Sequence, residues 1–165
     1  MTRKTRIRAA LVTAAALATA VTATVGVSAA GPEQDSKPTK KQIAALFDVW
    51  NAALQTGDPE KVTERYADDA VLLPTVSNKI RTDHAGIEDY FEHFLANKPV
   101  GKKTKTIINV LDRNSAIDTG SYVFTLTDPE TGEKREVNAR YTYEYEKRGG
   151  QWLIVNHHSS AMPEG

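Results

Sequence analysis

The sequence predicts an α+β domain in which helices cover one face of a curved antiparallel sheet. Apolar residues recur at helical spacing directly after residue 40, whereas apolar and polar residues alternate in the last part of the chain. The turn-forming stretches "DRN", "DPETG" and "RGG" separate the alternating segments. We therefore expect three helices followed by a four-stranded meander, within one domain over residues 40–163.

The first predicted helix begins at a capping box. Thr39 and Gln42 follow Pro38 at the spacing in which each side chain accepts a hydrogen bond from the other residue's backbone N–H. Apolar residues then recur at helical spacing as far as about Thr56, before Gly57. These residues are Ile43, Leu46, Phe47, Trp50, Ala53 and Leu54. Trp50 is interpreted either as a core residue or as a pocket wall.

Two further helices are predicted along the chain. Asp58 in the N-cap position with Pro59 directly after it predicts a second, shorter helix. A single apolar stripe predicts the third helix, which ends before Gly101. The stripe consists of Ile87, Tyr90, Phe91, Phe94 and Leu95.

Strands are predicted where the apolar period changes to two. Residues 68–75 read as a turn and a short strand ended by Pro74, and 76–83 as a loop or another short strand. The four strands of the meander are predicted at residues 103–111, 115–127, 133–147 and 151–160.

The first thirty residues have the pattern of a secretory signal peptide. Four basic residues among the first eight precede an acid-free apolar run over 9–27, and the small residues "VSAAG" follow. The alternative is a retained membrane helix, but the run is short and rich in alanine and threonine. No paired arginines are present, which favours the general secretion route. We expect cleavage after Ala29 or Ala30, an extracytoplasmic location and no stable membrane insertion of the mature chain.

Charge and cysteine content restrict the function of the mature chain. Of the 21 lysine and arginine residues, four lie in the predicted signal, leaving 17 against 21 aspartate and glutamate residues. A net negative domain argues against nucleic acid as a partner. The chain has no cysteine, so an exported form must fold without disulfides. Residues 31–39 are polar and contain two prolines, and we expect them to form a flexible leader.

Strand alternation predicts which side chains face the helices. If "RGG" closes an even-length hairpin loop, Tyr141, Tyr143 and Tyr145 share a face with Asn156 and His158. Trp152 and Ile154 belong to the same set. Along 115–127 the even-numbered residues are the more apolar ones, so this row faces the helices.

Asp118 is a carboxylate within that apolar row. A buried carboxylate needs a partner, and the candidates are His158, Arg140 and Arg81. The structural alternative is that Asp118 bends the strand near Gly120 while His158 binds a backbone carbonyl.

Metal and serine-nucleophile chemistry lack support in the sequence. The four histidines have no tight ligand spacing, and adjacent histidines on a strand point to opposite faces. Neither Ser159 nor Ser160 lies in a strand-turn-helix elbow, and no dinucleotide-binding glycine motif is present. We expect neither a metal nor a cofactor.

Four stretches of the chain resemble a known family in order and spacing. They are "FDVWNAALQTGDPEKVTERYADDAVLLP", "IEDYFEHFL", "AIDTGSYVFTL" and "ARYTYEYEKRGGQWLIVNHHSSAMP". The chain resembles bacterial relatives of the association domain of calcium/calmodulin-dependent protein kinase II. These belong to the nuclear-transport-factor-2-like (NTF2-like), or SnoaL-like, superfamily, and some carry an SgcJ/EcaC label. The most specific motif is G-x-W-x-I-V-x-x-H, present here as Gly150, Trp152, Ile154, Val155 and His158.

The resemblance implies a cone-shaped fold in which a curved sheet wraps around the long first helix and encloses a pocket. It also implies self-association, as dimers or larger rings, through the outer face of the sheet. In the kinase domain, pocket arginines take up small anionic or peptide ligands, and Arg81 and Arg140 are the candidates for that part here. Arg140 is offset from the family's arginine, and by parity the offset can turn it outward. The resemblance implies no kinase activity for this domain.

Two functional hypotheses follow. In the first, the protein is a secreted, self-associating domain whose pocket binds a small anionic ligand. Its pocket is predicted to be lined by Trp50, Tyr66, Asn78, Arg81, Tyr90, Asp118, Arg140, Tyr143, Asn156 and His158. In the second, it is a small cofactor-free isomerase, cyclase or hydrolase. Asp118 or His158 would then be the general base, and Tyr141 would donate a hydrogen bond to an oxyanion. A scaffold whose pocket is vestigial is a separate, third possibility.

Overall fold

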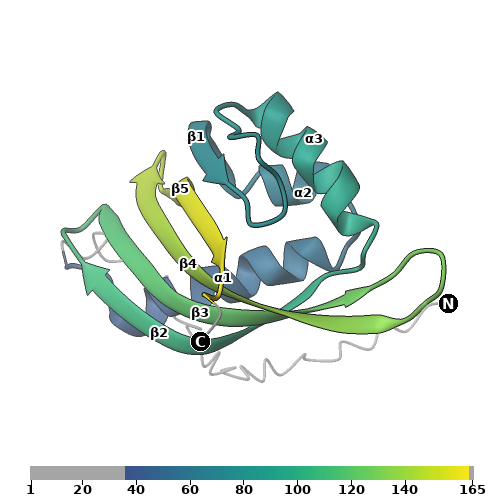
Figure 1. The fold of residues 1–165 in the computed structure, drawn as a ribbon. Coiled ribbons are helices and arrows are strands. Elements are labelled where there is room, and N and C mark those ends of the chain that lie inside the picture. The colour runs from purple at the N-terminus through teal and green to yellow at the C-terminus, as the bar shows by residue number, and fades with distance from the viewer. Residues whose placement is uncertain (1–35, 164–165) are drawn as a thin grey trace, which may run out of the picture. The chain divides into compact units, whose positions relative to one another are not determined.

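The computed structural model describes residues 36–163. In this part of the chain the helices are α1 (Lys40–Leu54), α2 (Pro59–Thr63) and α3 (His84–Leu95) (Figure 1). The predicted signal peptide lies outside the described residues, as does most of the predicted leader. Residues 36–39 have no regular secondary structure. None of the helices within the described range is long and apolar enough to cross a membrane.

The sheet has five strands and is mixed rather than a four-stranded meander. The strands are β1 (Tyr66–Leu73), β2 (Val100–Val110), β3 (Ser115–Thr127), β4 (Lys134–Arg148) and β5 (Gln151–Ala161). Their order is β1-β5-β4-β3-β2, and β1 runs parallel to β5 while all other neighbours are antiparallel. The short strand predicted within residues 68–75 thus joins the sheet as β1. It pairs with the backbone of β5, which would otherwise be an open edge of the sheet.

Helix α1 is the central element of the core. Its capping box is confirmed, since the Gln42 backbone N–H donates to the Thr39 hydroxyl at 3.2 Å and Thr39 N–H donates to the Gln42 side chain at 2.8 Å. The buried side of α1 carries Ile43, Phe47, Trp50 and Leu54. The Phe47 ring lies 6.3 Å from the rings of both Tyr122 and Tyr141, so α1 packs on the concave side of the sheet (Figure 1).

The segment after β1 folds back before α3 begins. Leu72 and Arg81 exchange two backbone hydrogen bonds, of 2.8 and 3.0 Å. Asp83 then caps α3 by accepting a hydrogen bond from the Gly86 N–H at 2.7 Å. The loop over residues 74–80 is therefore held close to β1, beside the helix that covers this end of the sheet (Figure 1).

Two irregularities in strand pairing decide which side chains face the core. In β2 the register shifts between Lys103 and Lys105, which leaves Thr104 without a paired residue on β3. In the β4–β5 pair it shifts between Glu144 and Tyr145, where Val155 is the extra residue of β5. Each extra residue reverses the facing of the side chains beyond it.

Candidate functional site

The bulge at Val155 overturns the predicted facing of the last strand. Tyr145 pairs with Ile154, as an even-length hairpin requires, but Tyr143 pairs with His157 and Tyr141 with Ser159. His157 is 4% exposed and lies on the inner face, whereas His158 is exposed on the outer face. The prediction that Asn156 and His158 face the pocket was therefore wrong. The consecutive apolar residues 152–155 break the alternation, and this was the sequence signal for the bulge.

The inner face encloses a small pocket between the sheet, the loop after β1 and α3. It has a volume of ≈ 40 Å³, which corresponds to about three water-sized sites. Its wall is mainly apolar and aromatic: Trp50, Leu72, Pro74, Val76, Tyr90, Phe91, Phe94, Phe124, Leu126, Val137 and Ala139. Its polar residues are Thr75, Tyr122, His157 and Ser159. Trp50 and Tyr90 thus line the pocket as predicted, while the sequence interpretation missed all four polar residues.

A chain of buried hydrogen bonds fixes the protonation of His157. Trp50 Nε1 can only donate, and it donates to the Tyr66 hydroxyl oxygen at 3.1 Å. Since Trp50 and His157 are the hydrogen-bond partners of the Tyr66 hydroxyl among the described residues, its own proton is satisfied only by donation to Nδ1 of His157, 2.9 Å away. The ring proton of the neutral imidazole then sits on Nε2, which is buried and has no hydrogen-bond partner among the described residues. Tyr66, predicted to line the pocket, instead lies behind it and orients His157.

Burial keeps the imidazole neutral. It lowers the pKa of His157 to about 3, mainly by desolvation, with a smaller contribution from His158. The ring stacks on Tyr143 at 4.1 Å between centroids, and it lies nearly perpendicular to the Trp50 ring at 5.5 Å between centroids. His157 is thus a rigidly held neutral hydrogen-bond donor beside the pocket.

This pKa makes a testable prediction about stability. A histidine in the unfolded chain takes up a proton near pH 6.5, but His157 in the folded chain does so only near pH 3. The contribution of His157 to stability is therefore complete above pH 6.5 and is lost as the pH falls toward 3. We expect the free energy of unfolding to drop by about 1 kcal/mol between pH 7 and 5.5 through this residue. Urea unfolding at the two pH values measures the drop.

Two variants separate His157 from other titrating groups. His157→Phe keeps an aromatic ring on Tyr143 and should remove most of the pH dependence in that interval. His158→Gln, next to it but exposed, should leave most of the dependence in place, because His158 makes only the smaller contribution to the shift. If His158→Gln flattens the profile and His157→Phe does not, the assignment of the neutral histidine is wrong.

A hydroxyl cluster closes the pocket on the side of the loop. Ser159 Oγ forms hydrogen bonds with Thr75 Oγ1 and with the Tyr122 hydroxyl. Burial raises the pKa of Tyr122, so the phenol is protonated at neutral pH. Because Thr75 belongs to the loop after β1, these contacts tie that loop to the floor of the sheet.

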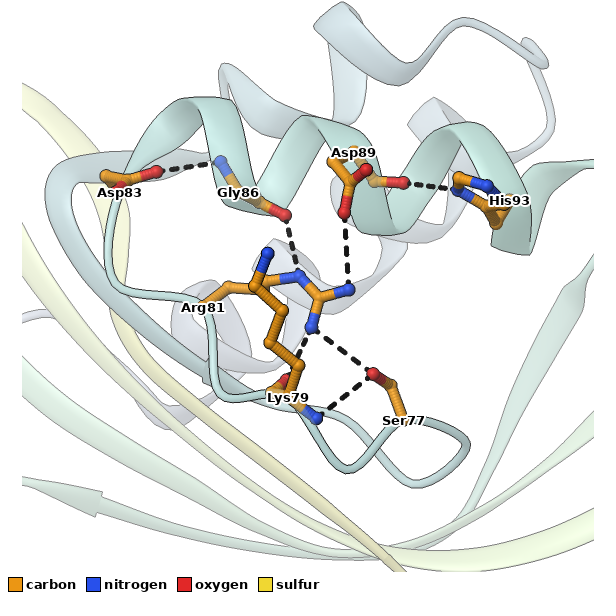
Figure 2. Close-up of polar contacts among 7 residues, drawn as sticks. All are labelled: Ser77, Lys79, Arg81, Asp83, Gly86, Asp89 and His93. Carbon is orange, nitrogen blue, oxygen red and sulfur yellow. Dashed lines mark hydrogen bonds and ion pairs between the residues drawn. The ribbon is translucent and has the colours of Figure 1, made fainter.

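Arg81 does not serve the pocket as predicted. Its Nε donates to Gly86 O at 3.0 Å, Nη1 donates to Lys79 O at 2.6 Å and to Ser77 Oγ at 3.2 Å, and Nη2 contacts Asp89 Oδ2 at 3.3 Å. Figure 2 shows the guanidinium between the loop and α3, with all of its nitrogens occupied. These contacts give Arg81 a structural role, because they join the loop to α3. Together with Tyr90 and Asp89, Arg81 also lines a separate, adjacent cavity.

Asp118 is buried on the inner row, as predicted, but its partners differ from the three that we expected. Lys103 Nζ lies 3.2 Å from Oδ2, and the Tyr141 hydroxyl donates to Oδ1 at 3.0 Å. Lys103 also donates to Ala44 O of α1 at 3.0 Å. Burial raises the pKa of the Asp118 carboxyl even though Lys103 opposes the shift. Asp118 does not line the pocket, and this cluster attaches α1 to β2 and β3.

The remaining predicted residues lie away from the pocket. Tyr143 is fully buried beneath His157, and Asn78 is exposed on the loop. Arg140 is exposed on the outer face, next to the strand that carries His158. Within residues 36–163 no group of three or more histidine, cysteine, aspartate or glutamate side chains is arranged to hold a metal ion.

Comparison with known proteins relates this architecture to a family. Residues 39–163 match the family described as calcium/calmodulin dependent protein kinase II association domain. A solved structure from Xanthomonas campestris, described in the same words, is 52% identical with a TM-score of 0.76, and the match covers 81% of this chain and 100% of that one. Among curated proteins, none matches.

Two more distant structures show the fold alone. An NTF2-like superfamily protein from Salmonella enterica serovar Typhimurium is 16% identical with a TM-score of 0.64, over 75% of this chain and 91% of that one. A protein from Streptomyces avermitilis, named as a dehydratase of the NTF2-like family, is 13% identical with a TM-score of 0.67, over 75% and 97%. The fold is therefore NTF2-like.

The family match includes every helix and strand that the structure describes. It begins at Thr39, the cap of α1, and ends at residue 163, just after β5. The resemblance seen in the sequence motifs is thus confirmed over the whole described domain. Together with the identity to the Xanthomonas campestris structure, this extent shows that the chain belongs to the calcium/calmodulin dependent protein kinase II association domain family.

Proposed function

We propose that the protein is an exported, self-associating domain whose inner pocket binds a small, largely apolar molecule that presents a hydrogen-bond acceptor. The observation that carries the ligand proposal is the unpartnered Nε2–H of His157, a buried residue that lines the pocket. An unpaired buried donor costs about 1–3 kcal/mol. An acceptor atom that enters the pocket and reaches Nε2 recovers this energy.

The loop after β1 controls how much room the ligand has. The ≈ 40 Å³ cavity is too small for most metabolites, so binding requires the loop to move. Thr75 holds the loop through the Ser159 hydroxyl, and Val76, which is 56% exposed, covers the pocket. A ligand that competes with Thr75 for Ser159 releases the loop and gains a second hydrogen bond.

The charge of the pocket favours an uncharged acceptor over the anion expected from the family resemblance. Among the described residues, no lysine or arginine lines this cavity. The guanidinium of Arg81 is occupied by the loop and α3. A carbonyl or ether oxygen suits a neutral imidazole N–H, whereas a carboxylate would be desolvated without a compensating cation.

The same geometry favours binding over general-base catalysis. Nδ1 of His157 is occupied by Tyr66 and Nε2 carries the proton, so neither nitrogen is free to abstract one. Asp118 and His158, the bases named by the enzymatic hypothesis, do not line the pocket. The dehydratase-named relatives are too distant in sequence to restore that hypothesis.

A pair of isosteric probes tests the ligand proposal. Acetophenone has a carbonyl acceptor that ethylbenzene lacks, and ligand-observed NMR measures the affinity of each. We expect wild-type protein to prefer acetophenone by about tenfold, the value of one additional hydrogen bond, and His157→Phe to lose the preference. His158→Gln is the matched control. A preference that survives in His157→Phe, or equal affinities in wild type, would refute the role of Nε2.

Export and self-association are tested separately. The basic and apolar N-terminal pattern supports export, and the mass of protein recovered outside the cytoplasm should correspond to a chain beginning after Ala29 or Ala30. The family's description as an association domain supports self-association, as do Ile107 and Met162, which are 49% and 45% exposed on or next to the outer face of the sheet. Sedimentation equilibrium should show an oligomer that Ile107→Glu weakens, and a monomer at all concentrations would contradict the proposal.

A further inference from the structure

The outer face of the sheet carries two rows of mostly polar side chains, with Ile107 as the apolar member. Register places Lys105, Ser121, Arg140 and Ser160 in one row across β2, β3, β4 and β5. The next row on the same four strands is Ile107, Thr119, Thr142 and His158. Members of the two rows are two positions apart on each strand, so all eight side chains point to the same face. We call these eight residues the outer-face array.

The outer-face array lines an open groove of ≈ 510 Å³. Gly120, Tyr141 and Met162 complete its lining, and none of the described residues that line it is an aspartate or glutamate. The nearest acidic positions on this face are Glu144, one row beyond the array, and Glu136, two rows beyond it at the other end. The groove is therefore a cationic region on a domain that carries a net negative charge once the predicted signal is excluded.

The basic side chains of the outer-face array are available to a ligand. In the part of the chain that the structure describes, Lys105, Arg140 and His158 form no side-chain hydrogen bond or ion pair, and all three are exposed. This distinguishes them from Lys103, whose ammonium group is held by Asp118, and from Arg81. Lys105 and Arg140 are two strands apart, about 10 Å between their backbones, so both side chains reach a common point.

We propose that the outer-face array binds a phosphate group. A phosphate presents up to two negative charges and three terminal oxygens, which matches cations on two strands with the hydroxyls of Ser121 and Ser160 beside them. A carboxylate is planar and is satisfied by a single guanidinium, so it would leave Lys105 unused. The groove is larger than one phosphate, which fits a phosphate carried on a soluble ester or on a lipid headgroup.

The phosphate site on the outer face is independent of the ligand proposed for the inner pocket. It does affect the proposed self-association, because both involve the outer face of the sheet. Two copies that met symmetrically through this face would bring their Lys105 and Arg140 side chains toward one another. A phosphate held in each groove neutralises that charge. Phosphate should therefore strengthen association if the outer face is the interface, and binding alone should remain if it is not.

Isothermal titration at constant ionic strength tests the site with inorganic phosphate and pyrophosphate as probes. The double variant Lys105→Gln with Arg140→Gln should weaken binding at least about tenfold, because it removes two charge-assisted contacts. The double variant Lys41→Gln with Arg135→Gln changes the same charge at exposed positions outside the groove and should retain wild-type affinity. Equal losses in both variants, or no binding of either probe and no binding to the vesicles below, overturn the proposal.

Vesicles identify the source of the phosphate. Cosedimentation compares vesicles of phosphatidylcholine with vesicles that also contain phosphatidic acid. Binding to the second kind that Lys105→Gln with Arg140→Gln abolishes assigns the site to a lipid headgroup. Binding of the soluble probes without vesicle binding assigns it to a soluble phosphate. Phosphate binding by a protein that remains monomeric supports the site while contradicting association through this face.

Discussion

The Gly120→Ala variant is expected to lose about 3 kcal/mol of its free energy of unfolding. A Cβ atom at residue 120 would stand 1.9 Å from the Lys105 carbonyl oxygen and 2.7 Å from the Lys105 carbonyl carbon. Both are backbone atoms, so no side-chain rotation relieves the overlap. The bulge at Thr104 brings this carbonyl inward, and its oxygen lies 3.3 Å from the Tyr141 hydroxyl oxygen. Adding one methyl group must therefore push β2 away from β3.

Urea unfolding measures the loss, with Thr125→Ala as the control on the same strand. Thr125 is half-buried and pairs with Val100 near the beginning of β2, away from the bulge. Its replacement changes strand propensity without a backbone overlap and should cost less than about 1 kcal/mol. A Gly120→Ala protein as stable as wild type would show that Lys105 O does not approach residue 120.

Replacing Lys103 by methionine should also cost about 3 kcal/mol at pH 7, because it leaves the Asp118 carboxylate buried without its cation. Asp118 is 0% exposed, and the Tyr141 hydroxyl would be the remaining polar contact to it of those described above. Methionine keeps most of the side-chain volume over the Phe47 ring, 5.0 Å from the Lys103 ammonium in wild type. The loss therefore reports the charge and not the packing.

The cost of Lys103→Met should depend on pH with a definite sign. Burial already raises the pKa of Asp118, and removing the cation raises it further. A carboxyl with a raised pKa in the folded state favours folding below the pKa of the unfolded chain, near 4. This contribution disappears as the pH rises through the folded-state pKa. The variant should therefore be closest to wild type in stability at mildly acidic pH and furthest from it at neutral pH.

A second substitution isolates the interaction. In Lys103→Met with Asp118→Asn the buried carboxylate is gone, so the double variant should recover much of the loss and show no such pH dependence. Stability at pH 5 and pH 7 distinguishes the cases. If the free energies lost in the two single variants simply added up in the double variant, Lys103 and Asp118 would not interact and the prediction would be wrong.

Local sequence patterns predicted the elements because their causes are local. The Thr39 capping box and the N-cap at Asp58 depend on neighbours within a few residues, and both formed as predicted. The apolar row of β3, with Asp118 in it, follows from uninterrupted alternation, and the structure buries that row. Family membership was likewise evident from motifs that extend over the whole domain.

The tertiary structure decided whether the side chains beyond each bulge point to the inner or the outer face of the sheet. A bulge is a property of two paired strands, since the extra residue exists only relative to its partner. The bulge at Thr104 turns Lys103 inward to Asp118 and Lys105 outward to the groove, although the two lysines are two positions apart. The bulge at Val155 turns His157 inward and His158 outward. The sequence by itself thus determined the elements, their order and the family, whereas strand pairing selected which lysine and which histidine face the interior.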